Sequence, residues 1–524
     1  MGRSGSSNEK NGFTRRDFIK STMVAGGGLM VAGTAGLSTV GAQTPQKGGL
    51  LRISMGRAIK NLNPILHHNN AEYMQGELMY SNLVRLSPKM EPIPDLAESW
   101  EASKDAKKWA FKLRKGVEFH SGGEVTAEDV VATVESILNP KTGSAGRKNI
   151  GPVASVKALD KYTVEFECKY PYAYLPQGVA YTNVKICPKK IVEEKFEELS
   201  TKDHGSGPFI LKEYVPSTYL VVERNPNYFI PDRPYLDGVR QVVYPDATGE
   251  VNALLTDELD VINEVPPNQF ERLKKMGKIE TRREVSGRFI NVVLGCDSAP
   301  FQDVRARQAL AMCMQREMAL QMTLEGFGSV ASDSPISKVY RHYKELPAKE
   351  QDLAKAADLL RAAGVKKGAT LKLAASNKPD LRSKLAVTIK EFARELGLNI
   401  QVERMEHSKY LKQVWTKGNF YIGFYNMQPT EDGIFSLLYT SDAPWNEPRW
   451  NNKEFDDLVA KARSELDPGK QFELYAKCQE MCYEEVPMLV PMFLDLLAAH
   501  GKQVHNFTLH PRGAYWFLEN VWMG

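Results

Sequence analysis

Residues 96–140 join a strand pattern to a helix pattern, and this limits the chain to folds that contain both kinds of element. Trp109, Phe111 and Leu113 alternate with more polar or smaller residues, which predicts a strand with one buried face. After glycine-marked turns, Thr126 stands where a helix N-cap is expected, and apolar residues then repeat at helical spacing until a proline ends the stretch. Short strands and amphipathic helices alternate through the rest of the chain, which favours an α/β or α+β class.

The length and the charge of the chain restrict it further. A chain of 524 residues divides into more than one domain, because single hydrophobic cores stop growing near about 250 to 300 residues. The formal net charge is only +4, and the Lys and Arg residues are scattered rather than clustered. A nucleic-acid partner is therefore not expected.

The N-terminal segment has the pattern of an export signal. Arg15 and Arg16 are followed by Phe, Ile and Lys, and an apolar, glycine-rich run covers residues 23–40. This arrangement resembles a twin-arginine signal peptide, with cleavage expected after Ala42. A membrane anchor is the alternative, since the run reaches about 18 residues, but its glycines and the lack of a basic stop signal favour export. No cysteine near Ala42 signals a lipid anchor, so we expect a freely diffusing periplasmic protein.

The cysteine and histidine residues do not form a ligand pattern for a metal or cofactor. Cys478 and Cys482 share a helical face at a spacing typical of packing, and His67 and His68 lack a third ligand at helical spacing. We therefore expect no metal and no cofactor, with cysteines that act as small buried hydrophobes. The six cysteines are Cys168, Cys187, Cys296, Cys313, Cys478 and Cys482.

A series of longer motifs resembles one known family. The motifs are residues 96–100 (LAESW), 111–120 (FKLRKGVEFH), 125–130 (VTAEDV), 205–209 (GSGPF), 223–228 (ERNPNY) and 300–309 (PFQDVRARQA). Together they are similar to the signature of the family 5 solute-binding proteins, which are dipeptide, oligopeptide and nickel receptors. The resemblance covers nearly all of the chain after residue 42.

The resemblance implies an architecture that periodicity alone does not supply. It is the periplasmic-binding-protein-like clam of type II, an α/β fold of two lobes with an extra inserted small domain and mixed sheets flanked by helices. Mapped here, lobe I would hold residues 43–75, 200–290 and 490–524, lobe II residues 76–199, and lobe III residues 291–489, after the signal at 1–42. We place the hinge at two apolar stretches, residues 289–294 and 490–494.

The best candidate for a binding segment is the loop that follows the apolar residues 420–422. The resemblance implies a tryptophan here and, just before a Tyr-Pro pair, an aspartate that holds a peptide α-amino group. In this chain Phe424 replaces the tryptophan, and Met427 occupies the aspartate position with Asn426 beside it. We also expect Tyr425 to contact the solute, so that its removal weakens binding with little loss of fold.

A methionine cannot pair with an ammonium group, and two explanations follow. Either Glu431 or Asp432 supplies the negative charge from slightly further along the chain, or the solute is not a free peptide amine. A third possibility for both acids is a solvated loop tip, because exposed acidic residues are common.

Three further residues complete the predicted site. Tyr73 lies in the stretch that the resemblance places at the cleft, and Arg288, directly before the predicted hinge, could bind a carboxylate with two parallel hydrogen bonds. Trp445 is a candidate platform for the solute, with packing as the alternative.

The resemblance implies a receptor rather than an enzyme. We expect the binding component of an ABC importer, a monomer that captures a small solute, with a peptide as the expected solute, by hinge closure. It would deliver this solute to the permease and ATPase subunits at the inner membrane. The alternatives are a receptor for an opine, a sugar or a nickel complex, and an exported hydrolase. The sequence contains no Gly-x-Ser-x-Gly elbow, HExxH motif or phosphate loop, which favours binding over chemistry.

Overall fold

The structure is a computed structural model that describes residues 44–244 and 246–524. The export signal predicted for residues 1–42 lies outside the described residues. Residues 46–524 form one compact unit. Within the described part, no helix combines the length and apolar character needed to cross a membrane.

One large mixed sheet organises the described residues. Its strands, in spatial order, are β15 (Asn399–Met405), β14 (Thr370–Ser376), β16 (Phe420–Tyr425), β12 (Ile279–Leu294), β17 (Met488–Gly501), β11 (Val261–Ile262), β1 (Leu50–Met55), β10 (Gly238–Val243), β9 (Tyr219–Arg224) and β8 (Phe209–Val215), with β13 (Gly328–Val330) paired to β17. Both parallel and antiparallel neighbours occur, as β1 with β10 and β12 with β17 show. The strands are drawn from distant parts of the chain, so the sheet joins its beginning, middle and end.

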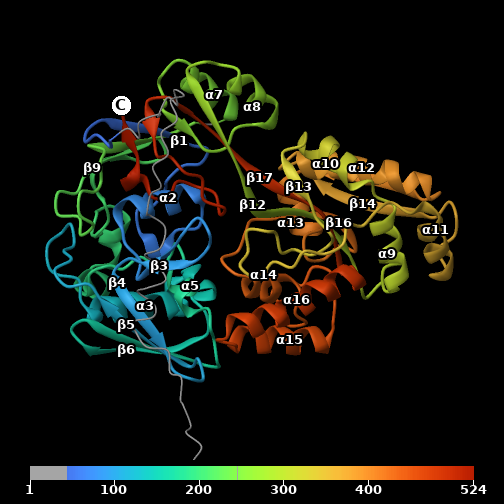
Figure 1. Cartoon of the computed structure of the whole chain (residues 1–524), viewed down its shortest axis with the longest axis horizontal. Coiled ribbons are helices and arrows are strands. Elements are labelled where there is room, and N and C mark those ends of the chain that lie inside the picture. Colours follow the sequence, from blue (N-terminus) through green and yellow to red (C-terminus); the bar gives the residue numbers. More distant parts are fainter. Residues whose placement is uncertain (1–43, 245) are drawn as a thin grey trace, which may run out of the picture. The chain divides into compact units, whose positions relative to one another are not determined.

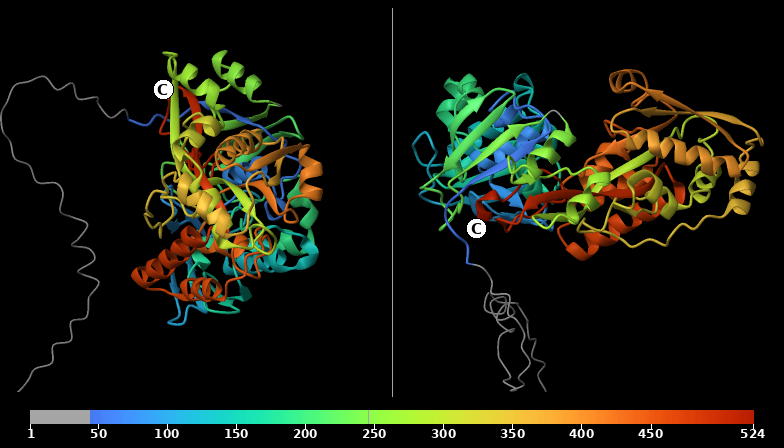
Figure 2. Two further views of the ribbon diagram at one scale, coloured as in Figure 1. Left: turned by 90° about the vertical axis from the view of Figure 1, so that its right-hand side faces the viewer. Right: turned by 90° about the horizontal axis from the view of Figure 1, so that it is seen from above.

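The two longest strands, β12 and β17, lie at the centre of this sheet. They pair antiparallel from Ile279 opposite Gly501 to Val293 opposite Met488, and they can be followed side by side in Figure 1 and Figure 2. Strand β17 is buried along almost its whole length, which explains its nearly continuous apolar sequence. One end of the pair contacts β11, and the other end contacts β16. The apolar stretches predicted as hinge segments therefore belong to strands that pair with each other.

A bulge interrupts this pairing in β12. Val285 lies opposite Asp495 and Arg288 lies opposite Leu494, so Ser286 and Gly287 are extra residues on the β12 side. The Ser286 hydroxyl donates a 2.6 Å hydrogen bond to the Leu494 carbonyl, which ties the bulge to β17. Bulges of this kind change the direction of the side chains that follow.

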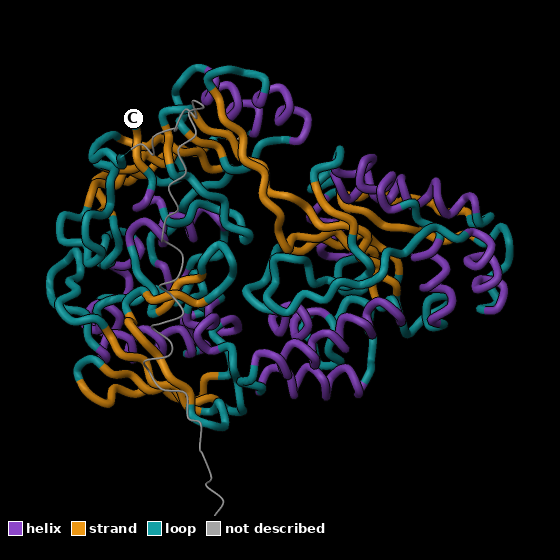
Figure 3. Tube along the Cα trace, viewed as in Figure 1, coloured by secondary structure: helices purple, strands orange, loops and turns teal. Residues whose placement is uncertain are grey.

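A separate four-stranded antiparallel sheet contains the strand predicted around Phe111. Its order is β4 (Ala97–Ala102), β5 (Lys108–Leu113), β7 (Thr163–Cys168) and β6 (Val153–Asp160), and these strands can be followed in Figure 3. Trp109, Phe111 and Leu113 are buried on β5, as their alternation predicts. Helix α3 (Ala127–Leu138) begins in a capping box. In this motif the side chains of Thr126 and Asp129 each accept a hydrogen bond from the backbone N–H of the other residue. Both predictions for this segment are confirmed.

Helices cover the part of the large sheet near β14 and β16. Apolar side chains of α9 (Val304–Met312), α10 (Arg316–Leu324), α11 (Leu353–Ala362) and α12 (Leu381–Glu395) form one buried cluster with these strands. Helices α14 (Glu431–Leu438), α15 (Lys453–Ser464) and α16 (Pro468–Glu485) belong to a second cluster. Cys478 and Cys482 are fully buried on α16, which confirms their predicted packing role, and all six cysteines are free thiols.

Shorter elements complete the described residues. The helices are α2 (Asn70–Met79), α4 (Gly146–Asn149), α5 (Leu175–Val179), α6 (Lys189–Glu194), α7 (Ala247–Leu255), α8 (Pro267–Lys274) and α13 (His407–Gln413). The 3-10 turns are η1 (Pro64–Leu66), η2 (Pro140–Thr142), η3 (Phe196–Ser200) and η4 (Leu518–Asn520). Two small sheets pair β2 (Val84–Leu86) with β3 (Pro92–Pro94) and β18 (Val504–His505) with β19 (Trp522–Met523).

The central strand pair depends on the packing of Phe289, which yields a first prediction. Its fully buried ring lies 5.7 Å from the Tyr425 ring and 6.4 Å from the Phe493 ring. Phe289→Ala should lower the free energy of unfolding by about 3 to 5 kcal/mol, because it leaves a cavity between three strands. Urea unfolding followed by circular dichroism measures this loss. Lys372→Ala on β14, where the side chain is 70% exposed, is the control and should change stability by less than about 0.5 kcal/mol. Equal effects of the two substitutions would contradict the assigned role of Phe289.

Candidate functional site

A cavity of about 730 Å³ lies where segments from distant parts of the chain meet. Residues from the start, middle and end of the chain line it, among them Tyr73, Arg288, Met427 and Trp516. Its volume falls within the range of small-molecule sites, about 300 to 1,000 Å³. We take it as the candidate binding site.

One wall of the cavity comes from α2, the loop at residues 181–182 and the loop at residues 512–516. Tyr73 lies on the first turn of α2, where the Asn69 side chain caps the helix by accepting from two backbone N–H groups. The Arg512 guanidinium lies 5.3 Å from the Tyr181 ring and 5.7 Å from the Trp516 ring. This wall combines aromatic surfaces with a positive charge, a pairing that favours cation–π contact.

The opposite wall comes from the end of β16, the loop after β14 and the start of α13. Phe424 is half-buried, Asn426 is exposed, and Met427 is 4% exposed. Lys378 and His407 add two basic groups. The His407 ring nitrogen Nδ1 lies 2.9 Å from the Ser376 hydroxyl, which fixes the orientation of the ring.

The bulge in β12 connects the two walls. Arg288 follows the bulge, lines the cavity, and lies 5.5 Å from the Phe424 ring. A Cβ atom on Gly287 would lie 2.6 Å from Met427 Cγ and 2.9 Å from the Tyr340 ring, so only glycine fits here without displacing a neighbour. The bulge thus directs Arg288 toward the cavity and leaves room for Met427.

Five of the nine residues predicted as site residues line this cavity. Tyr73 and Arg288 do so from α2 and β12, and the loop after β16 contributes the other three. The five are Tyr73, Arg288, Phe424, Asn426 and Met427. Residues from three separate parts of the chain, all selected from the sequence, are therefore brought together around one space.

Tyr425 is not among the lining residues. It is 6% exposed, its ring lies 6.2 Å from the Trp445 ring, and its hydroxyl accepts a hydrogen bond from Trp415 Nε1 at 3.3 Å. The side chain supports the loop from within the core. Its removal is therefore expected to cost stability, which corrects the expectation of little loss of fold.

Glu431 and Asp432 are also placed differently from the expectation. The loop ends at Thr430, which caps helix α14, and both acids belong to the first turn of that helix. Glu431 accepts a 2.6 Å hydrogen bond from the backbone N–H of His342, and both side chains are buried. Burial alone would raise the pKa of Glu431, but the hydrogen bond and charge of His342 outweigh it and lower that pKa. Neither acid is a solvated loop tip.

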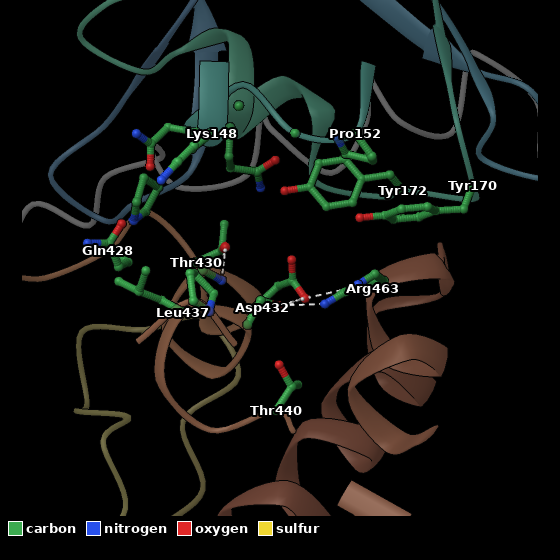
Figure 4. A pocket seen from close by; sticks show the side chains of 18 of the residues that line it. Lys148, Pro152, Tyr170, Tyr172, Gln428, Thr430, Asp432, Leu437, Thr440 and Arg463 are labelled. Carbon is green, nitrogen blue, oxygen red and sulfur yellow. Dashed lines mark hydrogen bonds and ion pairs between the residues drawn. The ribbon is translucent and has the colours of Figure 1, made fainter. Parts of the chain in front are cut away.

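Asp432 lines a second, smaller cavity of about 490 Å³, shown in Figure 4. Tyr170 and Tyr172 lie on one side of this space, and Asp432 and Arg463 lie on the other. Arg463 Nε donates a 3.0 Å hydrogen bond to the Asp432 carboxylate, so the two charges neutralise each other. Asp432 is committed to this ion pair.

Trp445 lies outside the residues that line the larger cavity. It is 36% exposed, and its ring lies 5.2 Å from the ring of Trp415 in an edge-on arrangement. The pair covers Tyr425 instead of facing the cavity.

Several lining residues are not predicted by any sequence pattern. The basic groups are Arg57, Lys378, His407 and Arg512, and the rings are Tyr181 and Trp516. For the wall that contains Arg512, the aromatic and glycine-containing sequence at residues 512–516 is the feature from which a binding loop could have been predicted. The others stand in separate loops, and nothing in their spacing links them. In the described part of the chain, no group of three or more His, Cys, Asp or Glu side chains could hold a metal ion.

Comparison with known proteins identifies the family. A model of the bacterial extracellular solute-binding proteins, family 5, matches residues 91–447. The chain belongs to this family. The oligopeptide-binding protein AppA of Bacillus subtilis (strain 168) is 26% identical over 92% of this chain and 93% of its own length. Di/tripeptide-binding protein 1 of Pseudomonas aeruginosa (strain UCBPP-PA14) is 26% identical over 82% of this chain and 85% of its own.

A solved structure of another protein supports the fold assignment. The ABC transporter substrate-binding protein CtaP from Listeria monocytogenes matches with a TM-score of 0.83 and 23% identity, over 91% of this chain and all of that one. The fold class predicted from the family resemblance, a periplasmic-binding-protein-like fold with mixed sheets flanked by helices, is confirmed. Family 5 proteins are extracellular solute receptors, and the two curated relatives are named as binding proteins.

In this family 5 protein, the buried carboxyl group of Glu447 makes the free energy of unfolding depend on pH. Burial raises the pKa of this fully buried carboxyl group to about 7. Hydrogen bonds from Tyr425, Asn291 and Tyr421 lower the pKa, but burial has the larger effect. The folded state therefore holds a proton that the unfolded state releases near pH 4.5. Stability from this group is present at low pH and is lost as the pH rises through about 7.

Glu447→Gln keeps a neutral side chain at every pH, which isolates this effect. The wild type should lose on the order of 2 to 3 kcal/mol relative to Glu447→Gln between pH 4.5 and 7, with no further change above. Thermal unfolding of both proteins across this range measures the difference. Glu193→Gln, at a side chain that is 52% exposed, should show no such trend. A constant difference between wild type and Glu447→Gln would rule out a buried neutral carboxyl.

Proposed function

We propose that this chain is the periplasmic binding component of an ABC importer. It captures a short peptide in the larger cavity and delivers it to a permease and ATPase in the inner membrane, without making or breaking a covalent bond. The observation that carries the proposal is the cavity itself. Its aromatic walls, its convergent polar groups and its volume of about 730 Å³ are those of a small-solute site.

The placement of the cavity supports capture by closure. In the proposed division of the chain, Tyr73 and Arg512 belong to lobe I, while Phe424 and Met427 belong to lobe III. The bulge in β12 lies between them and can absorb a small change of backbone angles while the strands stay paired. Closing the lobes around a solute would exclude water and strengthen polar contacts inside.

The names of the relatives support a peptide as the solute. AppA is an oligopeptide-binding protein, and the Pseudomonas protein is a di/tripeptide-binding protein. Met427 favours a second candidate, because it lines the cavity where the family resemblance implies an aspartate for a peptide amine. A receptor for a non-peptide solute, such as an opine, a sugar or a nickel complex, is therefore the alternative. Hydrolysis of the solute is the third and weakest candidate.

The peptide proposal predicts stabilisation by dipeptides. A dipeptide at about one hundred times its dissociation constant should stabilise the chain lacking residues 1–42 by about 2.7 kcal/mol, which raises the melting temperature. Trp516→Ala should remove this shift because it strips a wall of the cavity, whereas Trp445→Ala, which alters a ring outside the cavity, should retain it. Stabilisation by opines, sugars or nickel chelates without any dipeptide response would replace the peptide by another solute.

The export proposal rests on the N-terminal residues. We propose that the protein leaves the cytoplasm folded through the twin-arginine route, is cleaved near Ala42 and acts as a periplasmic monomer. Arg15→Lys combined with Arg16→Lys should leave the uncleaved precursor in the cytoplasm, as cell fractionation and immunoblotting would show. Lys10→Arg, which keeps both signal arginines, is the control. A normal periplasmic yield of the double variant would contradict this route.

A further inference from the structure

The charges that line the larger cavity are strongly unequal. Four permanent positive charges line it, whereas Glu264 is the one acidic residue among the described lining residues. The Glu264 side chain is 63% exposed, so water screens much of its charge. The four cations are Arg57, Arg288, Lys378 and Arg512.

Arg512 has unused hydrogen-bonding capacity inside the cavity wall. Its Nε and Nη1 atoms are buried and have no hydrogen-bond partner among the described residues. The rings of Tyr181 and Trp516 hold the guanidinium group in place without satisfying its N–H donors. A buried donor without a partner is costly, and a carboxylate is the group that a guanidinium binds best, through two parallel bonds.

Two other arginines show the same lack of partners on the opposite side. Within the described part of the chain, Arg288 Nε is buried without a hydrogen-bond partner, and the ion pair of Arg288 with Glu264 is loose at 3.6 Å. Arg382 is 7% exposed, and neither its Nε nor its Nη1 atom has a hydrogen-bond partner among the residues that the structure describes. Arg382 lies 5.9 Å from the ring of Phe424, behind the cavity wall.

The positive charge of this region affects a neighbouring group. Burial lowers the pKa of His407, and the charges of Arg382, Lys378 and Arg57 lower it further, more than Glu406 raises it. His407 lines the cavity, so the positive charge of these neighbours acts on a group that faces the space.

The nearby carboxylates are already engaged. Glu72, fully buried beneath the cavity, accepts from the backbone N–H groups of Lys60 and His68. Glu431 accepts from His342, and Asp432 pairs with Arg463. Met427 and Asn426 occupy the loop that faces the space, and neither can neutralise an ammonium group. The described lining therefore offers many partners for an anion and almost none for a cation.

From this imbalance we infer that the solute is an anion whose carboxylate binds between Arg512 and Arg288, and that a free amino group contributes little to its binding. This inference rests on the proposed role of the cavity as the solute site. Acidic peptides and N-acylated amino acids or peptides have the required chemistry.

The test compares matched forms of the same probes. A set of dipeptides is prepared with both ends free, with the amine acetylated and with the carboxylate amidated, alongside N-succinyl amino acids. Binding to the chain lacking residues 1–42 is measured by thermal shift and then by calorimetry. The acetylated dipeptides should bind about as tightly as the free ones, and amidation should weaken binding by about tenfold or more.

Variants connect the effect to the named residues. Arg512→Gln should weaken binding of the acetylated probe by about tenfold or more, and Arg512→Lys should recover only part of it, because lysine lacks the planar donor pair. Arg394→Gln, at a side chain that is 77% exposed, is the matched control for loss of one charge and should bind normally. Circular dichroism verifies that each variant is folded.

The outcomes separate this inference from the proposed function. Tight binding of the amidated dipeptides, or loss of binding on acetylation, would overturn the anion inference and leave the peptide receptor intact. Binding of N-succinyl amino acids with no dipeptide of any form would support the anion inference and overturn the peptide solute. Failure of every carboxylate-bearing probe to bind would overturn both.

Discussion

The pairing of β12 with β17 is the constraint on which the rest of the structure depends. These two strands contact β11 near one end and β16 near the other, so the pair joins two regions of the large sheet. The side chain of Asp495 on β17 is buried and charged, and Arg283 of β12 forms an ion pair with it. Without this partner the buried charge would destabilise the fold. The register of this pairing shifts at Ser286 and Gly287 and again between Ile290 and Val292, and the first of these bulges directs Arg288 toward the cavity.

The candidate site follows from this arrangement. Strand β16 joins the large sheet through β12, so the loop that carries Asn426 and Met427 begins beside Arg288. The loop at Arg512 reaches the same space from the C-terminal part of the chain. The surplus of positive charge is thus assembled from segments that are remote in sequence.

Local patterns predicted local structure well. Alternation around Phe111 and the cap at Thr126 depend on neighbours within a few residues, and the structure has both. The family resemblance supplied the fold class and five lining residues. Glu431 and Asp432 were misplaced because Thr430 begins a helix there, and Tyr425 because residues on one strand alternate between core and cavity. Arg512 and Lys378 were missed because only the tertiary fold brings their loops together.

The most direct measurement is a crystal structure of the chain lacking residues 1–42 with the solute that stabilises it most. We expect an intact solute in the cavity between Arg512 and Met427, with its carboxylate within hydrogen-bond distance of a guanidinium group. A solute found in the cavity beside Asp432 and Arg463, or one recovered in a chemically altered form, would contradict it.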